Sequence, residues 1–410
     1  MHRRAAASLL AVMAAGCGRT TPPGAATGMG VVAPPPTVAL SARAALGRQL
    51  FFDTGLSASG RQSCASCHDP AYAYAPANAL AVQLGGPRLD QPGTRAVPSL
   101  RYKEYTRPYS DRYENPDNAS PPAPGGGFTW DGRADTLTAQ AAIPLTAANE
   151  MANANAAAVA AKIAKAPYAQ TFKAVFGAES LETPDAALRQ AGEALEAFQR
   201  EDPSFHPYSS RFDRYRNNKI GGTLNAAELR GLAVYLDPQR GNCSACHLLG
   251  SGNAGSRDMT TDYSFAAIGV PRNAEIPANA DPAWFDLGLC GPLRRDHLPV
   301  AGGDKAQHCG MFKTPTLRNV ATRHAFMHNG VFHTLRATLE FYATRDTDPA
   351  RWYPKDAQGR VQKFDDLPPA YHASIDTQMP LDRRAAGSPP PLSTQDIDDL
   401  LAFLTTLNDD

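Results

Sequence analysis

Two short segments of the sequence, each with a pair of cysteines followed at once by a histidine, constrain this chain most. They are Cys64, Cys67 and His68 in the first segment and Cys243, Cys246 and His247 in the second. This is the attachment motif of c-type haem, in which both thiols add to the porphyrin vinyl groups and the histidine ligates the iron. Two complete copies predict two covalently bound haems, with His68 and His247 as proximal ligands.

Two other uses of these cysteines fit the sequence less well. A zinc site built from both pairs has no need of the adjacent histidines, and the pairs lie far apart in the chain. A dithiol redox site is typical of a βαβ unit, and neither pair has that context. The haem interpretation is therefore preferred.

Residues 1–17 have the form of a bacterial lipoprotein signal peptide. Basic residues come first, an apolar stretch follows, and small residues precede Cys17. Ala14 stands where such signals usually have leucine, so ordinary secretory cleavage is the alternative to lipidation of Cys17. Residues 18–38 are rich in Pro, Gly, Ala and Thr and are predicted to be a flexible tether. We expect a periplasmic protein that is held at the membrane by a lipid on Cys17.

Composition excludes two classes of protein. Forty Lys and Arg residues balance forty Asp and Glu residues, so no basic excess points to a nucleic-acid partner. Beyond the signal peptide, no apolar run reaches the length of about 18 residues that a membrane helix needs. With 43% hydrophobic and 20% charged residues, the chain is predicted to fold into globular domains.

Export also bears on the two remaining cysteines, Cys290 and Cys309. An oxidising compartment favours pairing of leftover thiols. We therefore predict a disulfide that closes one loop and has no catalytic role.

Helix-start signals surround both haem motifs in the same order. Ser41 precedes an apolar run before the first motif, and Asn225 with Glu228 resembles a capping box before the second. Thr183 and Ser393 start candidate helices after the two motifs, and no convincing strand pattern appears. The fold is therefore predicted to be mostly α, with two cytochrome-c-like haem domains related by duplication and long irregular loops. The predicted domains are residues 39–205 and 206–410.

Three further segments resemble the bacterial di-haem cytochrome c peroxidase and MauG family. They are residues 130–134 (Trp-Asp-Gly-Arg-Ala), residues 144–151, which end in Asn-Glu-Met, and residues 312–320 with the following 326–330. The resemblance extends from about residue 41 to residue 407. It implies a peroxidatic N-terminal domain, an electron-transfer C-terminal domain and two c-type haems.

The resemblance also assigns roles to two residues. It places Trp130 between the haems as an electron relay, with a packed core indole as the alternative. It places Glu150 over the peroxide-binding iron as a general acid and base, with a surface glutamate as the alternative.

The chain departs from the family at two places. Relatives have a histidine that caps the peroxidatic iron, but residues 69–100 contain none, so the first haem is expected to be five-coordinate or water-bound. Relatives also bind calcium between the haems through an asparagine and two carbonyl groups. The matching positions here are Ala96, Arg323 and Ala325, which leaves calcium binding uncertain.

The second iron needs a distal ligand, and Tyr342 holds the position where many relatives have methionine. MauG-like members of the family have tyrosine there. A phenolate favours ferric iron and lowers the potential. Met327 and His328 are competing ligands by residue type, although His328 is better explained as a structural hydrogen-bonding residue.

The leading functional hypothesis is an enzyme that reduces hydrogen peroxide with electrons from a small exported cytochrome c or copper protein. The alternative, which Tyr342 favours, is a MauG-like oxidase that uses peroxide to modify residues of a partner protein. A non-catalytic electron carrier is the third possibility, and two permanently six-coordinate haems would identify it.

Overall fold

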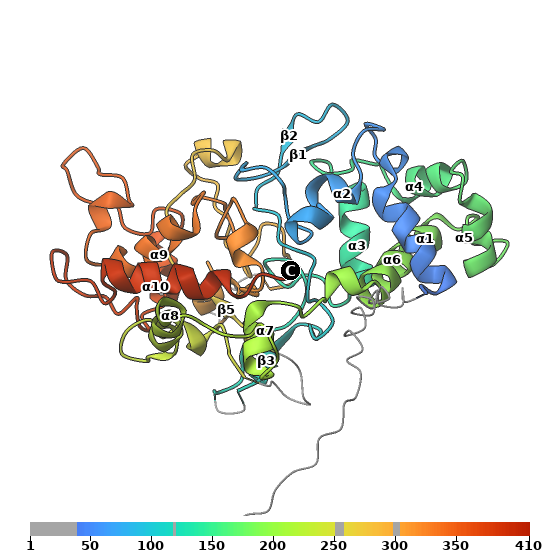
Figure 1. Ribbon diagram of the computed structural model, residues 1–410. Helices are drawn as coiled ribbons and strands as arrows, with labels where there is room; N and C mark the ends of the chain where they lie inside the picture. Colours follow the sequence, from blue (N-terminus) through green and yellow to red (C-terminus); the bar gives the residue numbers. More distant parts are fainter. Residues whose placement is uncertain (1–38, 118–119, 251–257, 298–303) are drawn as a thin grey trace, which may run out of the picture. The chain divides into compact units, whose positions relative to one another are not determined.

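Helices account for most of the regular structure in the computed structural model, which describes residues 39–117, 120–250, 258–297 and 304–410 (Figure 1). The predicted signal peptide, with Cys17, and the predicted tether lie outside the described residues. Long irregular segments and short 3-10 turns connect the helices. None of the described helices combines the length and the apolar character that crossing a bilayer requires.

The helices around the first motif are α1 (Ala42–Phe52), α2 (Cys64–Cys67), α3 (Leu137–Thr146), α4 (Ala156–Ile163), α5 (Ala169–Phe176) and α6 (Pro184–Glu201). Helices α1, α3 and α4 pack against the long helix α6, and α2 and α5 contact α1. Ser41 caps α1 as predicted, because its Oγ accepts a hydrogen bond from the Ala44 amide at 3.1 Å. A Cβ on Gly47 of α1 would lie 1.9 Å from the Ala194 carbonyl oxygen of α6. Glycine therefore allows these two helices to approach closely.

The described helices around the second motif are α7 (Arg211–Arg216), α8 (Ala226–Leu236), α9 (Leu335–Thr344) and α10 (Thr394–Thr405). Helices α8 and α9 pack against α10. The predicted capping box of α8 is present, with hydrogen bonds of 3.0 and 2.8 Å between Asn225 and Glu228. A Cβ on Gly231 of α8 would lie 2.0 Å from the Asp399 carbonyl oxygen of α10. A glycine thus allows close packing of α1 on α6 in one case and of α8 on α10 in the other.

The strands of the described residues are very short. Three antiparallel pairs are present: β1 (Leu84–Gly85) with β2 (Gln91–Pro92), β3 (Ser110–Tyr113) with β4 (Ala123–Gly125), and β5 (Phe265–Ala266) with β6 (Phe312–Lys313). They are too short to show the alternating pattern by which a strand is predicted. The last pair matters for function because it holds Lys313 opposite Phe265.

The hydrophobic core of Ala39–Asp410 has two main clusters. One combines α1 and α6 around Leu46, Leu50 and Phe198, and the other combines α8, α9 and α10 around Phe341, Leu400 and Phe403. Residues Ala39–Asp410 nevertheless form one compact unit. The division at residue 205 and the duplication therefore stay predictions.

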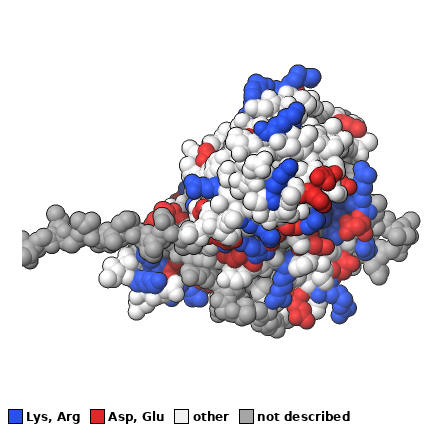
Figure 2. All heavy atoms as spheres, turned by 90° about the vertical axis from the view of Figure 1, so that its right-hand side faces the viewer, with Lys and Arg blue, Asp and Glu red and all other residues white. Residues whose placement is uncertain are grey.

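Two further features concern the loops and the surface. Cys290 and Cys309 form the predicted disulfide. On the face that Figure 2 shows, basic and acidic side chains are mixed with uncharged ones. This face shows no continuous basic area.

Candidate functional site

The first cysteine pair lies on α2, at the wall of a cavity. Cys64, Cys67 and His68 line this first cavity. His68 Nδ1 lies 3.0 Å from the Tyr74 carbonyl oxygen, which orients the ring and leaves Nε2 as the nitrogen available to a metal.

The second pair lies in an equivalent setting. Cys243, Cys246 and His247 line a second cavity, and His247 Nδ1 lies 3.2 Å from the Thr260 carbonyl oxygen. Burial lowers the pKa of both motif histidines to about 4, so both rings are neutral, as iron ligation requires.

The four motif thiols are not paired with one another. Burial raises the pKa of Cys64 to about 12, of Cys67 to about 11 and of Cys243 to about 12. A dithiol redox centre needs a lowered thiol pKa, so these values oppose that alternative. Among the described residues, no group of three or more His, Cys, Asp or Glu side chains is arranged to hold a metal ion.

Partly buried cations at the junction of the two cavities fit the acidic groups of haem. Lys103 and Lys313 line both cavities, and Arg323 lines the second. Burial lowers the pKa of Lys103 to about 8, of Arg323 to about 10 and of Lys313 well below its usual range. Within the described part of the chain, none of the three is ion-paired to a carboxylate. Because an unpaired buried charge is costly, the propionates of bound haem would supply the missing counter-charge.

Trp130 lies where the two cavities meet. Its side chain lines both cavities, and its Nε1 donates to the Ala96 carbonyl oxygen at 2.7 Å. The Lys313 amide donates to the Trp130 carbonyl oxygen at 2.8 Å. The tryptophan is therefore anchored from both halves of the chain.

The rest of the Trp-Asp-Gly-Arg segment forms a buried charge network. The fully buried Asp131 pairs with Arg95 at 2.7 Å and with Arg133 at 2.9 Å. Arg95 is also held by Asp286 at 2.6 Å. Both arginines line the first cavity. Asp131 therefore fixes two cations beside Trp130.

Glu150 lies in the turn after α3, where its side chain is exposed and lines the first cavity. Its carbonyl oxygen accepts from the Gly86 amide at 2.8 Å, and a Cβ on Gly85 would lie 2.3 Å from the Asn149 carbonyl oxygen. The close approach of β1 thus fixes the backbone of Glu150. Burial raises the pKa of the Glu150 carboxyl group, and the charge of Arg133 opposes this shift.

The described lining of the first cavity includes one carboxylate and one histidine. Among its described lining residues, Glu150 is the only carboxylate and His68 the only histidine. Gln140 of α3 lines the same cavity, although the sequence alone did not identify it as a site residue. A single glutamine in an alanine-rich helix has no spacing that distinguishes it.

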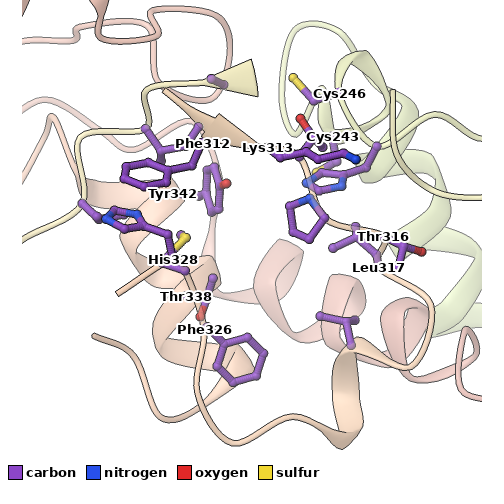
Figure 3. Close-up of a pocket in the computed structure, with 18 of the residues that line it drawn as sticks. Cys243, Cys246, Phe312, Lys313, Thr316, Leu317, Phe326, His328, Thr338 and Tyr342 are labelled. Carbon is purple, nitrogen blue, oxygen red and sulfur yellow. The ribbon is translucent and has the colours of Figure 1, made fainter. Parts of the chain in front are cut away.

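Tyr342 of α9 lines the second cavity together with His247. Its hydroxyl group points into that cavity (Figure 3). Burial raises the pKa of the phenol, so ionisation of Tyr342 needs a cation such as iron nearby.

The competing ligands of the second cavity differ in their packing. The ring of His328 stacks on Phe312 with centroids 3.4 Å apart, and its Nε2 lies 3.6 Å from Asp366 (Figure 3). The His328 carbonyl oxygen accepts from the Ala96 amide at 2.7 Å. The ring thus packs against Phe312, but its Nε2 has no hydrogen-bond partner among the described residues, and the structural role of His328 stays a prediction. Met327 also lines the cavity.

The positions that match the calcium site hold a guanidinium group. Arg323 Nη2 donates to the carbonyl oxygens of Val97 at 2.9 Å and Ala325 at 3.4 Å. The Ala96 carbonyl oxygen accepts from Trp130. The Ala325 carbonyl oxygen, at one of the positions that match the calcium site, thus accepts from a guanidinium group.

A helical fold with two cysteine-lined cavities, joined by one tryptophan, defines a di-haem c-type cytochrome. The family model of di-haem cytochrome c peroxidases matches residues 41–220. The methylamine utilization protein MauG of Paracoccus denitrificans is 37% identical over 310 residues, which cover 73% of this chain and 74% of that protein. The cytochrome c551 peroxidase of Nitrosomonas europaea is 27% identical over 302 residues, which cover 72% of this chain and 71% of that protein.

A solved structure is similar over most of its length. The diheme peroxidase BthA of Burkholderia thailandensis has a TM-score of 0.79 at 41% identity, with 91% of this chain and 87% of that chain covered. The chain therefore belongs to the di-haem cytochrome c peroxidase and MauG family. It is a peroxidase-type oxidoreductase, and its family carries two c-type haems.

Proposed function

We propose that this protein reduces hydrogen peroxide to water with electrons from a small exported cytochrome c or copper protein. The observation that carries the proposal is the first cavity, where Glu150 is the only carboxylate and His68 the only histidine among the described lining residues. His68 would hold the iron, and the described lining offers no second histidine that would close it to peroxide.

The haems, when bound through Cys64, Cys67, His68, Cys243, Cys246 and His247, supply the iron at which peroxide is reduced and a store of electrons. Peroxide cleavage needs a base that takes a proton from one oxygen and returns it to the other, so that this oxygen leaves as water. A Glu150 carboxylate oxygen performs both transfers. Burial raises the pKa of this carboxyl group, which favours uptake of the peroxide proton.

Two further residues serve electron transfer. Trp130 relays electrons between the two sites, which its position at both cavity walls supports. Tyr342 would hold the second iron through its hydroxyl oxygen, which its place in the second cavity with the motif cysteines and His247 supports.

A MauG-like activity, in which peroxide is used to modify residues of a partner protein, is the second candidate. It is favoured by a tyrosine at position 342 and by the 37% identity to MauG of Paracoccus denitrificans. In either case we propose an exported, periplasmic protein that a lipid on Cys17 holds at the membrane.

Rapid mixing tests the proposal. The fully oxidised holoprotein is mixed with hydrogen peroxide in a stopped-flow spectrometer, and turnover is then followed with reduced cytochrome c. Immediate reaction of the oxidised protein and rapid cytochrome oxidation are expected. Reaction with peroxide but no turnover of any small donor would favour the MauG-like activity, and an oxidised protein inert to peroxide would contradict both.

A further inference from the structure

Two tyrosines outside the residues discussed so far lie against each other beside the first cavity. The ring centroids of Tyr102 and Tyr208 are 4.9 Å apart, with 57° between the ring planes. Tyr102 lines the first cavity and is 2% exposed, whereas Tyr208 is partly exposed. The Tyr208 amide donates to the Tyr102 hydroxyl oxygen at 3.2 Å. The pair thus leads from the cavity wall toward the protein surface.

Each hydroxyl group of the pair donates to a carboxylate. The Tyr102 hydroxyl lies 2.5 Å from Asp409 Oδ2, and the Tyr208 hydroxyl donates to Glu104. Asp409 is buried and also accepts from Arg101 at 3.1 Å and Asn319 at 2.6 Å. A tyrosine loses an electron readily only when its phenolic proton has an acceptor within hydrogen-bond reach. Both tyrosines have such an acceptor.

A single arginine holds the two rings in place. The Arg318 guanidinium lies 4.7 Å from the Tyr102 ring centroid and 4.8 Å from that of Tyr208. Its charge is balanced by Asp213, with contacts of 2.9 and 2.7 Å. The rings are therefore fixed without an uncompensated positive charge.

Tyr263 provides a contrast at the same cavity. It also lines the first cavity and is 6% exposed, but its buried hydroxyl has no hydrogen-bond partner among the described residues. The Lys313 ammonium lies 5.6 Å from its ring. Oxidation of Tyr263 would leave its proton without an acceptor.

We propose that Tyr102 and Tyr208 form a redox-active pair that carries oxidising equivalents from the first cavity toward the surface when no electron donor is present. The inference rests on the proposed function, since hydrogen peroxide is the oxidant. Tyr102 gives one electron to the peroxide-oxidised haem site, and its phenolic proton passes to Asp409. Tyr208 then gives one electron to the Tyr102 radical, which recovers its proton from Asp409, while the Tyr208 proton passes to Glu104.

Once Tyr208 has reduced the Tyr102 radical, Tyr102 can be oxidised a second time and supply the second electron. One hydrogen peroxide takes two electrons and two protons to form two waters. Two tyrosines, each oxidised to a neutral radical, supply the two electrons and release two protons to Asp409 and Glu104. The carboxylates return these protons to solvent, from which the peroxide oxygens take up two protons, so electrons and protons balance.

The test is freeze-quench electron paramagnetic resonance of the holoprotein after one equivalent of hydrogen peroxide, without donor. Peroxide consumption is measured in the same samples. Protein grown with ring-deuterated tyrosine should give a narrower radical signal than unlabelled protein, because the unpaired electron resides on a tyrosine ring. This comparison needs no substitution, so it does not depend on the folding of a variant.

Three variants locate the radical. Y102F should lose the tyrosine signal, Y208F should change its line shape by confining the radical to Tyr102, and Y263F should keep it. All three should retain both haems by the pyridine haemochrome assay. Y263F is the matched control, because it removes a hydroxyl from the same cavity wall.

The outcomes separate this pair from the proposed function. Peroxide consumption without a deuterium-sensitive radical, or a signal lost in Y263F but kept in Y102F and Y208F, would overturn the pair and leave the peroxidase function standing. No peroxide consumption would overturn the proposed function and the pair with it.

Discussion

Replacement of Glu150 by glutamine removes the carboxylate of the first cavity and keeps a side chain of the same size. Because Glu150 is the only carboxylate among the described residues of that cavity, no lining carboxylate can replace it. Turnover should fall by ~100-fold to ~10,000-fold, the usual contribution of a positioned acid and base. This corresponds to about 3 to 5 kcal/mol of transition-state stabilisation.

The pH dependence follows from the surroundings of Glu150. Burial raises the pKa of its carboxyl group above the ordinary value of 4.5, and Arg133 lowers it. The carboxylate must be ionised to take the peroxide proton, so the rate falls as pH drops through this raised pKa. R133Q removes the opposing positive charge and should move the acid limb of kcat/KM to higher pH.

The assay is peroxide-dependent oxidation of reduced cytochrome c, with haem content measured in every preparation. Glu179 is an exposed glutamate outside both cavities, so E179Q is the matched control and should turn over like the wild type. Unchanged turnover of E150Q with both haems in place would refute the role of Glu150. An equal loss of turnover in E179Q would show that the loss in E150Q does not depend on the position of Glu150 in the first cavity.

Three further predictions concern the haems and the cation position between them. Substitution of Cys64 and Cys67 by alanine should leave one haem per chain by the pyridine haemochrome assay, and two haems would contradict the attachment site. Y342F should remove the low-spin signal of the second haem, and Y342M should raise its reduction potential, because thioether stabilises ferrous iron; an unchanged potential would exclude Tyr342 as ligand. A calcium chelator should leave the unfolding temperature unchanged, because Arg323 donates to the Val97 and Ala325 carbonyl oxygens, and a fall that calcium reverses would overturn this.

Much of the helical fold could be predicted because the relevant chemistry is local. Ser41 and Ser393 cap α1 and α10 through amides three residues further on, so a short stretch of sequence contains both partners. Thr183 begins α6 without a side-chain cap, and Pro184 at the first helical position explains why the prediction still holds. The pairing of β5 with β6 joins distant segments by two residues each, and no local pattern predicts that.

The candidate sites divide in the same way. The haem motifs could be predicted because all three functional residues lie within five positions. Lys103 comes from a loop and Lys313 from β6, and only the fold brings both cations to the junction of the cavities. Both ammonium groups need a counter-charge because the fold partly removes them from solvent, and that removal cannot be predicted from the sequence.

The central claim is that the first iron is open and the second is closed by Tyr342. Low-temperature electron paramagnetic resonance of the fully oxidised protein as isolated counts open and closed irons directly. The account predicts one high-spin haem, at His68, and one low-spin haem, at His247. Two low-spin haems in the wild-type protein would contradict it.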